Sequence, residues 1–352
     1  MAITKVSTAV VDMSGNTGGL VIAKGNDSER PLPANIGMIR ENTETTPSKL
    51  EVYNSTGWIT LQAASPLIVD YLVVAGGGGS GAAGAAGSGS GGGGAGGLLT
   101  SIGSTALSLN TSTVYSITVG DGGASVAGVT TPRYKTGNNG DNSEFSGTGI
   151  TTITAISGGA GSSGSDSSTT ANSGGSGGGS GYNGTGANGT AGQGNAGGSS
   201  STGSPFAASG GGGAGSPGSG APNNSTGGDG GAGLSNSITG TATFYAGGGG
   251  GSPSYNGTGT GGSGGSNIGG YGTSGLVGNS GATNTGSGGG AGSPTSSGHS
   301  TGGAGGSGVV ILRYPSNYST TKSGIISSVD STSVSGFIIE TVISGTGTIT
   351  FS

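Results

Sequence analysis

The residue best suited to chemistry is the single histidine, His299, which lies among serines in the segment SSGHS. A Ser–His pair could in principle act as nucleophile and base, but such a pair needs a third group that orients the imidazole. The sequence offers no second histidine for relay chemistry, so we interpret His299 as an exposed turn residue. Matches to Gly-x-Gly-x-x-Gly arise by chance in so glycine-rich a chain and carry no dinucleotide signal.

Acidic residues are too sparse for a calcium β-roll, which needs an aspartate in each short repeat. The acids between residues 76 and 308 are Asp121, Asp141, Glu144, Asp166 and Asp229. Only Asp229 lies in a GGDGG repeat, and that repeat has no neighbours. The chain has no cysteine, so thiolate metal sites and disulfides are excluded. We therefore expect no metal, no cofactor and no catalytic residues; a depolymerase is disfavoured because no paired carboxylates converge.

Aromatic residues beside the glycine blocks are the remaining candidates for function. They either cover the glycine structure or present rigid anchors to a partner, as binding loops do. Tyrosine also stacks on sugar rings, so a glycan partner is plausible. The candidate receptor-binding residues are Tyr182, Phe206, Tyr255, Tyr271 and His299.

The chain contains 92 glycines and 11 prolines among 352 residues, and most glycines lie between residues 76 and 308. Such a composition raises disorder as an alternative. Disordered chains are usually rich in charge, whereas 7% of these residues are charged. We therefore expect an ordered structure held by backbone hydrogen bonds. The net charge of −5 disfavours nucleic-acid binding, and no apolar run is long enough to enter a membrane as a helix.

Glycines recur three residues apart within the blocks, which is the period of the polyproline-II helix. Examples are 78-81-84-87, 175-178-181-184, 227-230-233 and 302-305-308. This helix has no internal hydrogen bonds, so its backbone groups must pair with neighbouring helices. The pattern predicts a sandwich of polyglycine or polyproline-II helices joined by turns, although dense glycine also produces such spacing by chance.

Short apolar segments divide the chain into three parts. Residues 1–66 form a small β module for attachment and oligomerisation, with a hairpin from residues 50–53 and 58–61. Residues 67–314 form the glycine-rich domain, with strands at 113–119 and 150–156. We predict that its bracketing segments, residues 69–75 and 309–314, pair as neighbouring strands. Residues 315–352 form a C-terminal β segment with a hairpin turning at residues 344–347. The fold class is mainly β and irregular, with almost no α-helix.

Ordered motifs at both ends of the tract carry a resemblance. YLVVAGGGG at 71–79 is followed by GGGGAGG at 91–97, YSITVGDGG at 115–123, GNNGDNSEF at 137–145 and GGSGVVILRY at 305–314. This series resembles the glycine-rich domain of bacteriophage tail fibres and receptor-binding adhesins. Residues 30–43, with the following segment to Trp58, resemble a small module near the start of phage fibre proteins.

The resemblance implies a virion fibre or adhesin that recognises the host cell surface, released outside the cell after lysis. The implied partners are a tail or baseplate protein at the N-terminal module, and a bacterial surface glycan or outer-membrane protein at the turns. A homotrimer is expected. The alternative is a purely structural fibre, capsid decoration or self-assembling extracellular filament without receptor binding.

Overall fold

The structure is a computed structural model, and it describes residues 23–31, 33–44, 49–61, 67–164, 170–200, 206–255 and 259–352. The chain forms two compact units, Met1–Ser65 and Pro66–Ser352. The described residues contain strands and short 3-10 turns but no α-helix, as the sequence predicted.

The N-terminal unit is a four-stranded sheet in the order β1-β2-β3-β4. Its strands are β1 (Ala23–Gly25), β2 (Ile39–Asn42), β3 (Lys49–Asn54) and β4 (Gly57–Leu61). The predicted hairpin is confirmed: Val52 pairs with Ile59 and Tyr53 with Trp58. The 3-10 turn η1 (Asp27–Glu29) begins at Asn26, whose side chain accepts the Ser28 N–H and caps the turn.

One face of this sheet buries charged side chains instead of apolar ones. Glu51 is 3% exposed and accepts hydrogen bonds from Arg30 (2.7 Å) and Asn42 (2.8 Å). Arg40 is also buried, with its guanidinium 5.8 Å from the centroid of the Trp58 ring. Ile39, Leu50 and Ile59 are exposed by 49%, 43% and 42%, and their registers place them together on the opposite face.

The second unit is built on a nine-stranded sheet in the order β12-β11-β9-β17-β15-β5-β7, with β16 paired to β17 and β8 to β5. The strands are β5 (Leu67–Val74), β7 (Leu98–Thr100), β8 (Leu107–Leu109), β9 (Val114–Val119), β11 (Ser143–Gly147), β12 (Ile153–Ala155), β15 (Val309–Pro315), β16 (Thr320–Asp330) and β17 (Phe337–Phe351). The two bracketing segments pair as predicted, in antiparallel register, with Val310 opposite Val73.

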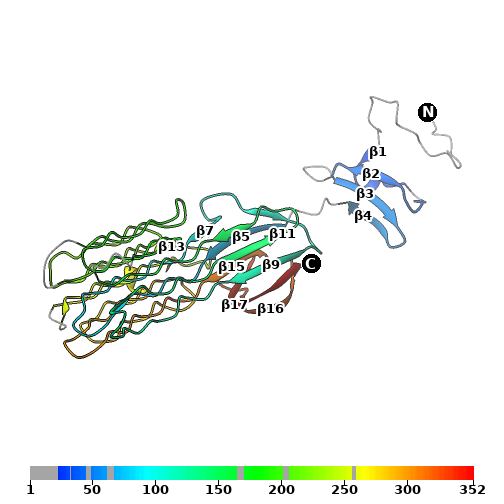
Figure 1. The fold of residues 1–352 in the computed structure, drawn as a ribbon. Coiled ribbons are helices and arrows are strands. Elements are labelled where there is room, and N and C mark those ends of the chain that lie inside the picture. Colours follow the sequence, from blue (N-terminus) through cyan, green and yellow to red (C-terminus); the bar gives the residue numbers. More distant parts are fainter. Residues whose placement is uncertain are drawn as a thin grey trace, which may run out of the picture. The chain divides into compact units, whose positions relative to one another are not determined.

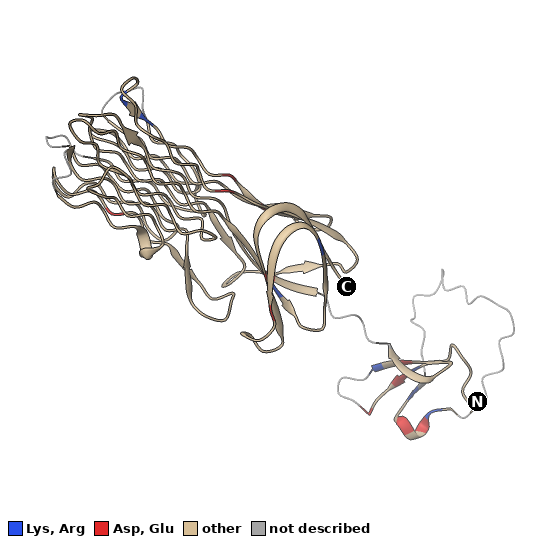
Figure 2. Cartoon of the chain, turned by 90° about the horizontal axis from the view of Figure 1, so that it is seen from below, with Lys and Arg blue, Asp and Glu red and all other residues tan. Residues whose placement is uncertain are grey.

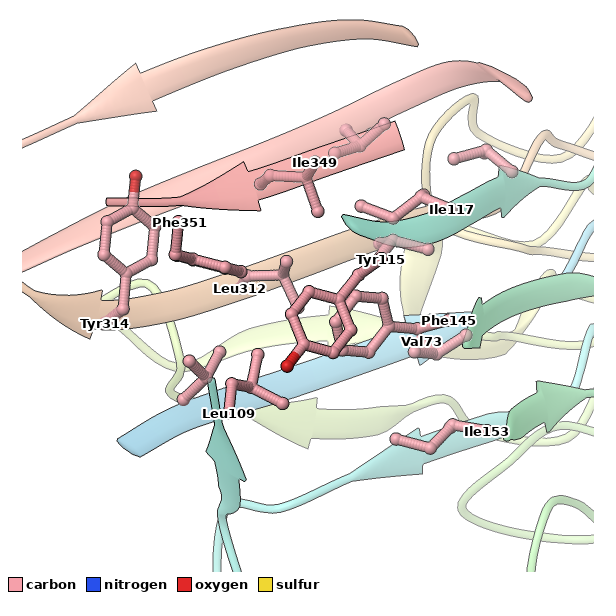
Figure 3. Packing of buried hydrophobic residues seen from close by; sticks show 14 of the residues in the cluster. Val73, Leu109, Tyr115, Ile117, Phe145, Ile153, Leu312, Tyr314, Ile349 and Phe351 are labelled. Atoms are coloured by element: carbon pink, nitrogen blue, oxygen red, sulfur yellow. The ribbon is translucent and has the colours of Figure 1, made fainter. Parts of the chain in front are cut away.

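One hydrophobic cluster lies within this strand region (Figure 3), and a second packs side chains of β5 and β15 against Ile238 and Tyr245. Tyr115 is fully buried, and its ring lies 5.8 Å from that of Phe145 and 6.2 Å from that of Phe351. Tyr314 closes the cluster, with its ring perpendicular to Phe351 at 5.2 Å. Four aromatic residues thus pack together at the centre of a core that is otherwise built from Leu, Val, Ile and Ala.

The C-terminal segment contains a β-hairpin, but not the one expected. The turn predicted at residues 344–347 is wrong, because β17 runs unbroken from Phe337 to Phe351. Its partner in the hairpin is β16, and the turn between them lies at residues 331–336. Along its other edge β17 bonds first to β15 and then to β9. The compositional division at residue 315 is therefore not a division of the fold, since this segment lies inside the second unit.

The glycine runs extend from the sheet and bond to one another with a threefold rotation (Figure 1). The N–H groups of residues 76 and 79 donate to the carbonyls of Asp141 and Asn138. Those of residues 77 and 80 donate to Gly306 and Gly303, and those of residues 78 and 81 donate to Gly94 and Gly91. Every third residue therefore meets the same neighbouring run. Residues 302–308 show the same pattern, because the N–H groups of residues 302, 305 and 308 donate to the carbonyls of residues 126, 123 and 120 in a single neighbouring run. The predicted helices with three residues per turn are confirmed.

At many glycines of these runs the packing leaves no room for a side chain. A Cβ placed on Gly93 would lie 2.0 Å from the carbonyl oxygen of Gly78, and one on Gly78 would lie 2.2 Å from that of Gly159. Glycine is required at both positions because the neighbouring backbone occupies the space of a methyl group. We call this assembly of hydrogen-bonded runs the glycine lattice.

The runs pass back and forth between the sheet and the far end of the lattice. Gln193 marks a turn near the sheet, where its amide donates to Thr154 O and accepts from Ile156 N beside β12. The short hairpin of β13 (Leu234–Asn236) and β14 (Thr243–Tyr245) and the 3-10 turn η3 (Gly265–Asn267) are further reversals between runs. At the far end, β6 (Ala82–Ala83) pairs with β10 (Tyr134–Lys135). We call this far end, with its turns at residues 84–88, 129–135, 182–184, 221–226, 273–277 and 294–299, the distal end.

Candidate binding surface at the distal end

Three turns that are far apart in the sequence are joined at the distal end by backbone hydrogen bonds. The Gly84 N–H donates to Arg133 O (2.5 Å), and the Ala86 N–H donates to Thr295 O (2.8 Å). The Ala85 N–H donates to Nδ1 of His299 (3.0 Å). The turn at 84–88 therefore holds both neighbours, and the three form one continuous surface on a fixed backbone.

His299 is exposed, as the sequence indicated, but its ring has a structural contact. Because Nδ1 accepts the Ala85 N–H, the neutral ring carries its proton on Nε2. The adjacent Ser300 hydroxyl accepts the Ala83 N–H (2.8 Å). The His299 ring and the Ser300 hydroxyl thus accept hydrogen bonds from Ala85 and Ala83, and do not form a Ser–His pair with each other.

Two of the predicted aromatic residues form a pair. The rings of Tyr182 and Phe206 lie 4.5 Å apart at 64°, in an edge-to-face arrangement. Phe206 has a φ of +79°, and its carbonyl oxygen accepts the Gly89 N–H (3.1 Å). A side chain held at positive φ is strained, so its neighbours fix this turn in place. Both residues are half-buried, which leaves part of each ring open to solvent.

The other two aromatic candidates differ in their positions. Tyr255 is half-buried and follows Ser254, whose carbonyl oxygen accepts the Ser293 hydroxyl (2.8 Å) near the distal end. Tyr271 lies within a glycine run and not at a turn; its carbonyl oxygen accepts the Asn279 N–H of the next run. Its hydroxyl donates to Asn267 (2.9 Å), so the structure does not bring Tyr271 to the distal turns.

Sequence reasoning missed the basic residues of the distal end. Arg133 and Lys135 are the only Lys or Arg between residues 67 and 308. β10 brings Lys135 to the lattice end by pairing it with Ala82, and the carbonyl of Arg133, just before β10, accepts the Gly84 N–H there; Figure 2 shows blue at that end. Tyr134 between them points the other way, since its ring occupies the space beside Gly164 where a Cβ would lie 2.4 Å away. Lys135, the next residue of β10, points to the side opposite Tyr134, and Arg133 immediately precedes the strand.

Apolar side chains are exposed on another distal turn, at residues 273–277. Leu276 and Val277 are 40% and 63% exposed at the next turn. The Thr301 N–H donates to Leu276 O (2.7 Å), which joins that turn to the run after His299. A Cβ on Gly298 would meet the Leu276 side chain at 2.9 Å. The distal end therefore presents cations, a histidine and aliphatic groups on adjacent turns.

In the described part of the chain no cluster of three or more His, Cys, Asp or Glu residues could hold a metal ion. No helix among the described residues is long and apolar enough to cross a membrane.

A family model described as the glycine-rich domain matches residues 54–315. The match includes β4, both bracketing strands and the whole glycine lattice. No curated protein matches the chain.

Proposed function

The chain belongs to the glycine-rich domain family, and on that premise we propose that it is a bacteriophage virion fibre or adhesin that recognises the host cell surface through its distal turns. One observation carries the proposal: turns from distant parts of the sequence meet on one surface above a rigid backbone lattice. Fixed turns lose little conformational entropy on binding, which is an advantage for recognition. We propose that the chain works without catalysis or cofactor, on the virion and outside the cell after lysis.

We also propose that the N-terminal unit attaches the chain to a virion tail or baseplate protein and self-associates into a trimer. The surface of its sheet supports this part of the proposal. Its sheet buries Arg40 and Glu51 and exposes Ile39, Leu50 and Ile59 on the opposite face. Exposed apolar patches of this kind are typical of protein interfaces. A module this small also gains stability from a partner that covers such a face.

A purely structural fibre or filament is the second candidate, and the half-burial of Tyr182 and Phe206 against each other favours it. In that case the aromatic turns only cover the lattice. Cell binding separates the two functions, since a structural protein needs no affinity for cells.

The test is binding of the labelled full chain to a panel of bacterial strains, measured by flow cytometry. The variant Tyr182→Ala/Phe206→Ala removes the aromatic pair, and His299→Ala removes the ring that ties two turns. Phe244→Ala is the matched control, because Phe244 is 47% exposed on β14 away from the distal turns. We expect at least a tenfold loss for the distal variants and none for the control. Equal binding by all variants would contradict recognition through these turns, and binding to no strain would contradict the adhesin.

A further inference from the structure

We propose that the partner of the distal end is an anionic surface polysaccharide, bound through Arg133 and Lys135. This inference rests on the proposed function and specifies the chemistry of the receptor. It starts from the uneven distribution of charge. The whole chain has a net charge of −5, yet the described distal turns contain two cations and no acid.

Both cations are available to a ligand. Arg133 is exposed and Lys135 is partly exposed, and neither forms an ion pair with any residue that the structure describes. The other cations of the second unit are engaged: Arg313 with Asp70 at 2.7 Å, and Lys322 with Glu340 at 2.8 Å. Asp166 follows Gly164 in the sequence and lies outside the described residues.

The backbone holds the pair in a fixed geometry. Lys135 and Tyr134 are in register with Ala82 and Ala83, and the Arg133 carbonyl accepts the Gly84 N–H. The Tyr134 hydroxyl lies 3.4 Å from the Ser88 hydroxyl, which links β10 to the turn at 84–88. Arg133 immediately precedes β10, so only Tyr134 separates the two cations along the chain. Arginine adds planar, bidentate recognition of carboxylate or phosphate.

A repeating polymer suits this surface better than a folded protein. Exposed ion pairs each contribute little free energy because water screens them, so two cations bind one anion weakly. A standard protein interface buries about 800 Å² on each side around an aromatic and aliphatic centre. The distal turns expose few large apolar side chains, Leu276 and Val277. A polymer that repeats its anionic group supplies many equivalent contacts, and linked weak contacts gain affinity together.

The experiment measures binding of the full chain to immobilised alginate, which carries carboxylates, to phosphomannan, which carries phosphates, and to neutral dextran. We expect binding to one or both anionic polymers and not to dextran. Between 50 and 500 mM salt the affinity should fall about 30-fold, if both cations release counterions as they do on nucleic acids. The two anionic polymers distinguish the carboxylate source from the phosphate source.

Arg133→Gln/Lys135→Gln should lose at least tenfold in affinity and most of the salt dependence. Lys24→Gln/Lys49→Gln is the matched control, because it removes the same charge from exposed positions of the N-terminal unit. An equal loss in both double variants, or no binding to either anionic polymer, overturns the inference. Unchanged thermal unfolding of Arg133→Gln/Lys135→Gln excludes a folding defect.

The strain panel separates this inference from the proposed function. Cell binding that survives Arg133→Gln/Lys135→Gln and is not inhibited by soluble alginate or phosphomannan leaves the adhesin standing, with a neutral glycan or a protein as its receptor. Absence of cell binding by the unmodified chain removes the adhesin itself, whatever the polymers show.

Discussion

Gly93 is buried in the glycine lattice, and a Cβ there would overlap the carbonyl group of Gly78 in a neighbouring run. We expect Gly93→Ala to lower the free energy of unfolding by about 3 kcal/mol or more, since overpacking of a rigid interior has no cheap relaxation. Gly275→Ala is the matched control: its Cβ would meet nothing closer than 4.0 Å. That variant should be neutral or slightly stabilised. Thermal unfolding of both variants checks the difference, and equal stability would contradict the close packing.

Glu340 is a second residue whose surroundings predict a large effect. Its carboxylate is fully buried and accepts the Lys322 ammonium at 2.8 and 3.0 Å. Lys322→Met leaves that carboxylate without its partner, and we expect a loss of about 3 kcal/mol. The double variant Lys322→Met/Glu340→Gln should recover part of this loss. Chemical denaturation of the unmodified chain and both variants gives their free energies of unfolding. A double variant no more stable than Lys322→Met would show that the unpaired carboxylate is not the cause of the loss.

Single residues also show how far the sequence can be read. His299 was correctly interpreted as an exposed turn residue, but its bond to Ala85 depends on a contact across more than two hundred positions. Tyr271 was grouped with the turn aromatics because it stands beside glycines, and local sequence does not separate a run from a turn there. Arg133 and Lys135 were missed because their place at the distal end follows from pairing with Ala82 and Ala83.

The β16–β17 hairpin has a turn that depends on one carboxylate. Asp330 accepts hydrogen bonds from the Thr332 and Ser333 N–H groups at 2.7 and 3.1 Å and from both hydroxyls. Hydrogen bonds from Ser333 and Thr332 hold the pKa of the Asp330 carboxyl well below its usual range. Because the folded pKa is the lower one, this stabilisation is complete above about pH 4 and is lost as pH falls through the folded pKa.

Asp330→Asn should therefore unfold at lower temperature than the unmodified chain at pH 7, and the difference should shrink in acid. Thermal unfolding followed between pH 7 and pH 2 checks this at the level of the hairpin. A difference that stays constant over that range would mean that the turn is stabilised by hydrogen bonds alone and not by the charge.

The turn predicted at residues 344–347 was wrong because of two glycines inside β17. Gly345 and Gly347 look like the centre of a turn, yet both lie inside a strand. Gly345 has a φ of +101° opposite a register shift in β16, and a Cβ on Gly347 would lie 2.0 Å from Ser323 O. These glycines permit irregular pairing and close approach, which a strand uses as readily as a turn does. The paired bracketing strands were predictable because their apolar composition requires burial on both faces.

At the scale of the whole molecule, the division between an apolar strand region and a polar lattice has a thermodynamic signature. Unfolding the lattice exposes mainly peptide groups, which lower the heat capacity change, and few apolar side chains, which raise it. We expect a heat capacity change of unfolding clearly below about 12 cal/mol/K per residue for the full chain. Differential scanning calorimetry at several pH values gives this quantity; an ordinary value would contradict a lattice held by backbone bonds.

The threefold glycine spacing predicted that the runs would bond to their neighbours, but not which run neighbours which. The sequence 76–81 does not reveal that its partners are near residues 91, 138 and 303. All runs have nearly the same composition, so neighbour choice is set by the lengths of turns and by the strands at which runs begin. This is why the distal surface emerged only from the structure.

The antiparallel pairing of β5 with β15 also has a mechanical consequence. A fibre held at its N-terminus and pulled through its distal turns transmits tension into the lattice unit through Leu67, the first residue of β5. The hydrogen bonds from β5 to β15 and β7 lie across the strand direction, so tension along β5 loads them together and not one after another. We expect rupture under force to require sliding of the whole strand, as a single-molecule pulling curve with one high peak would record.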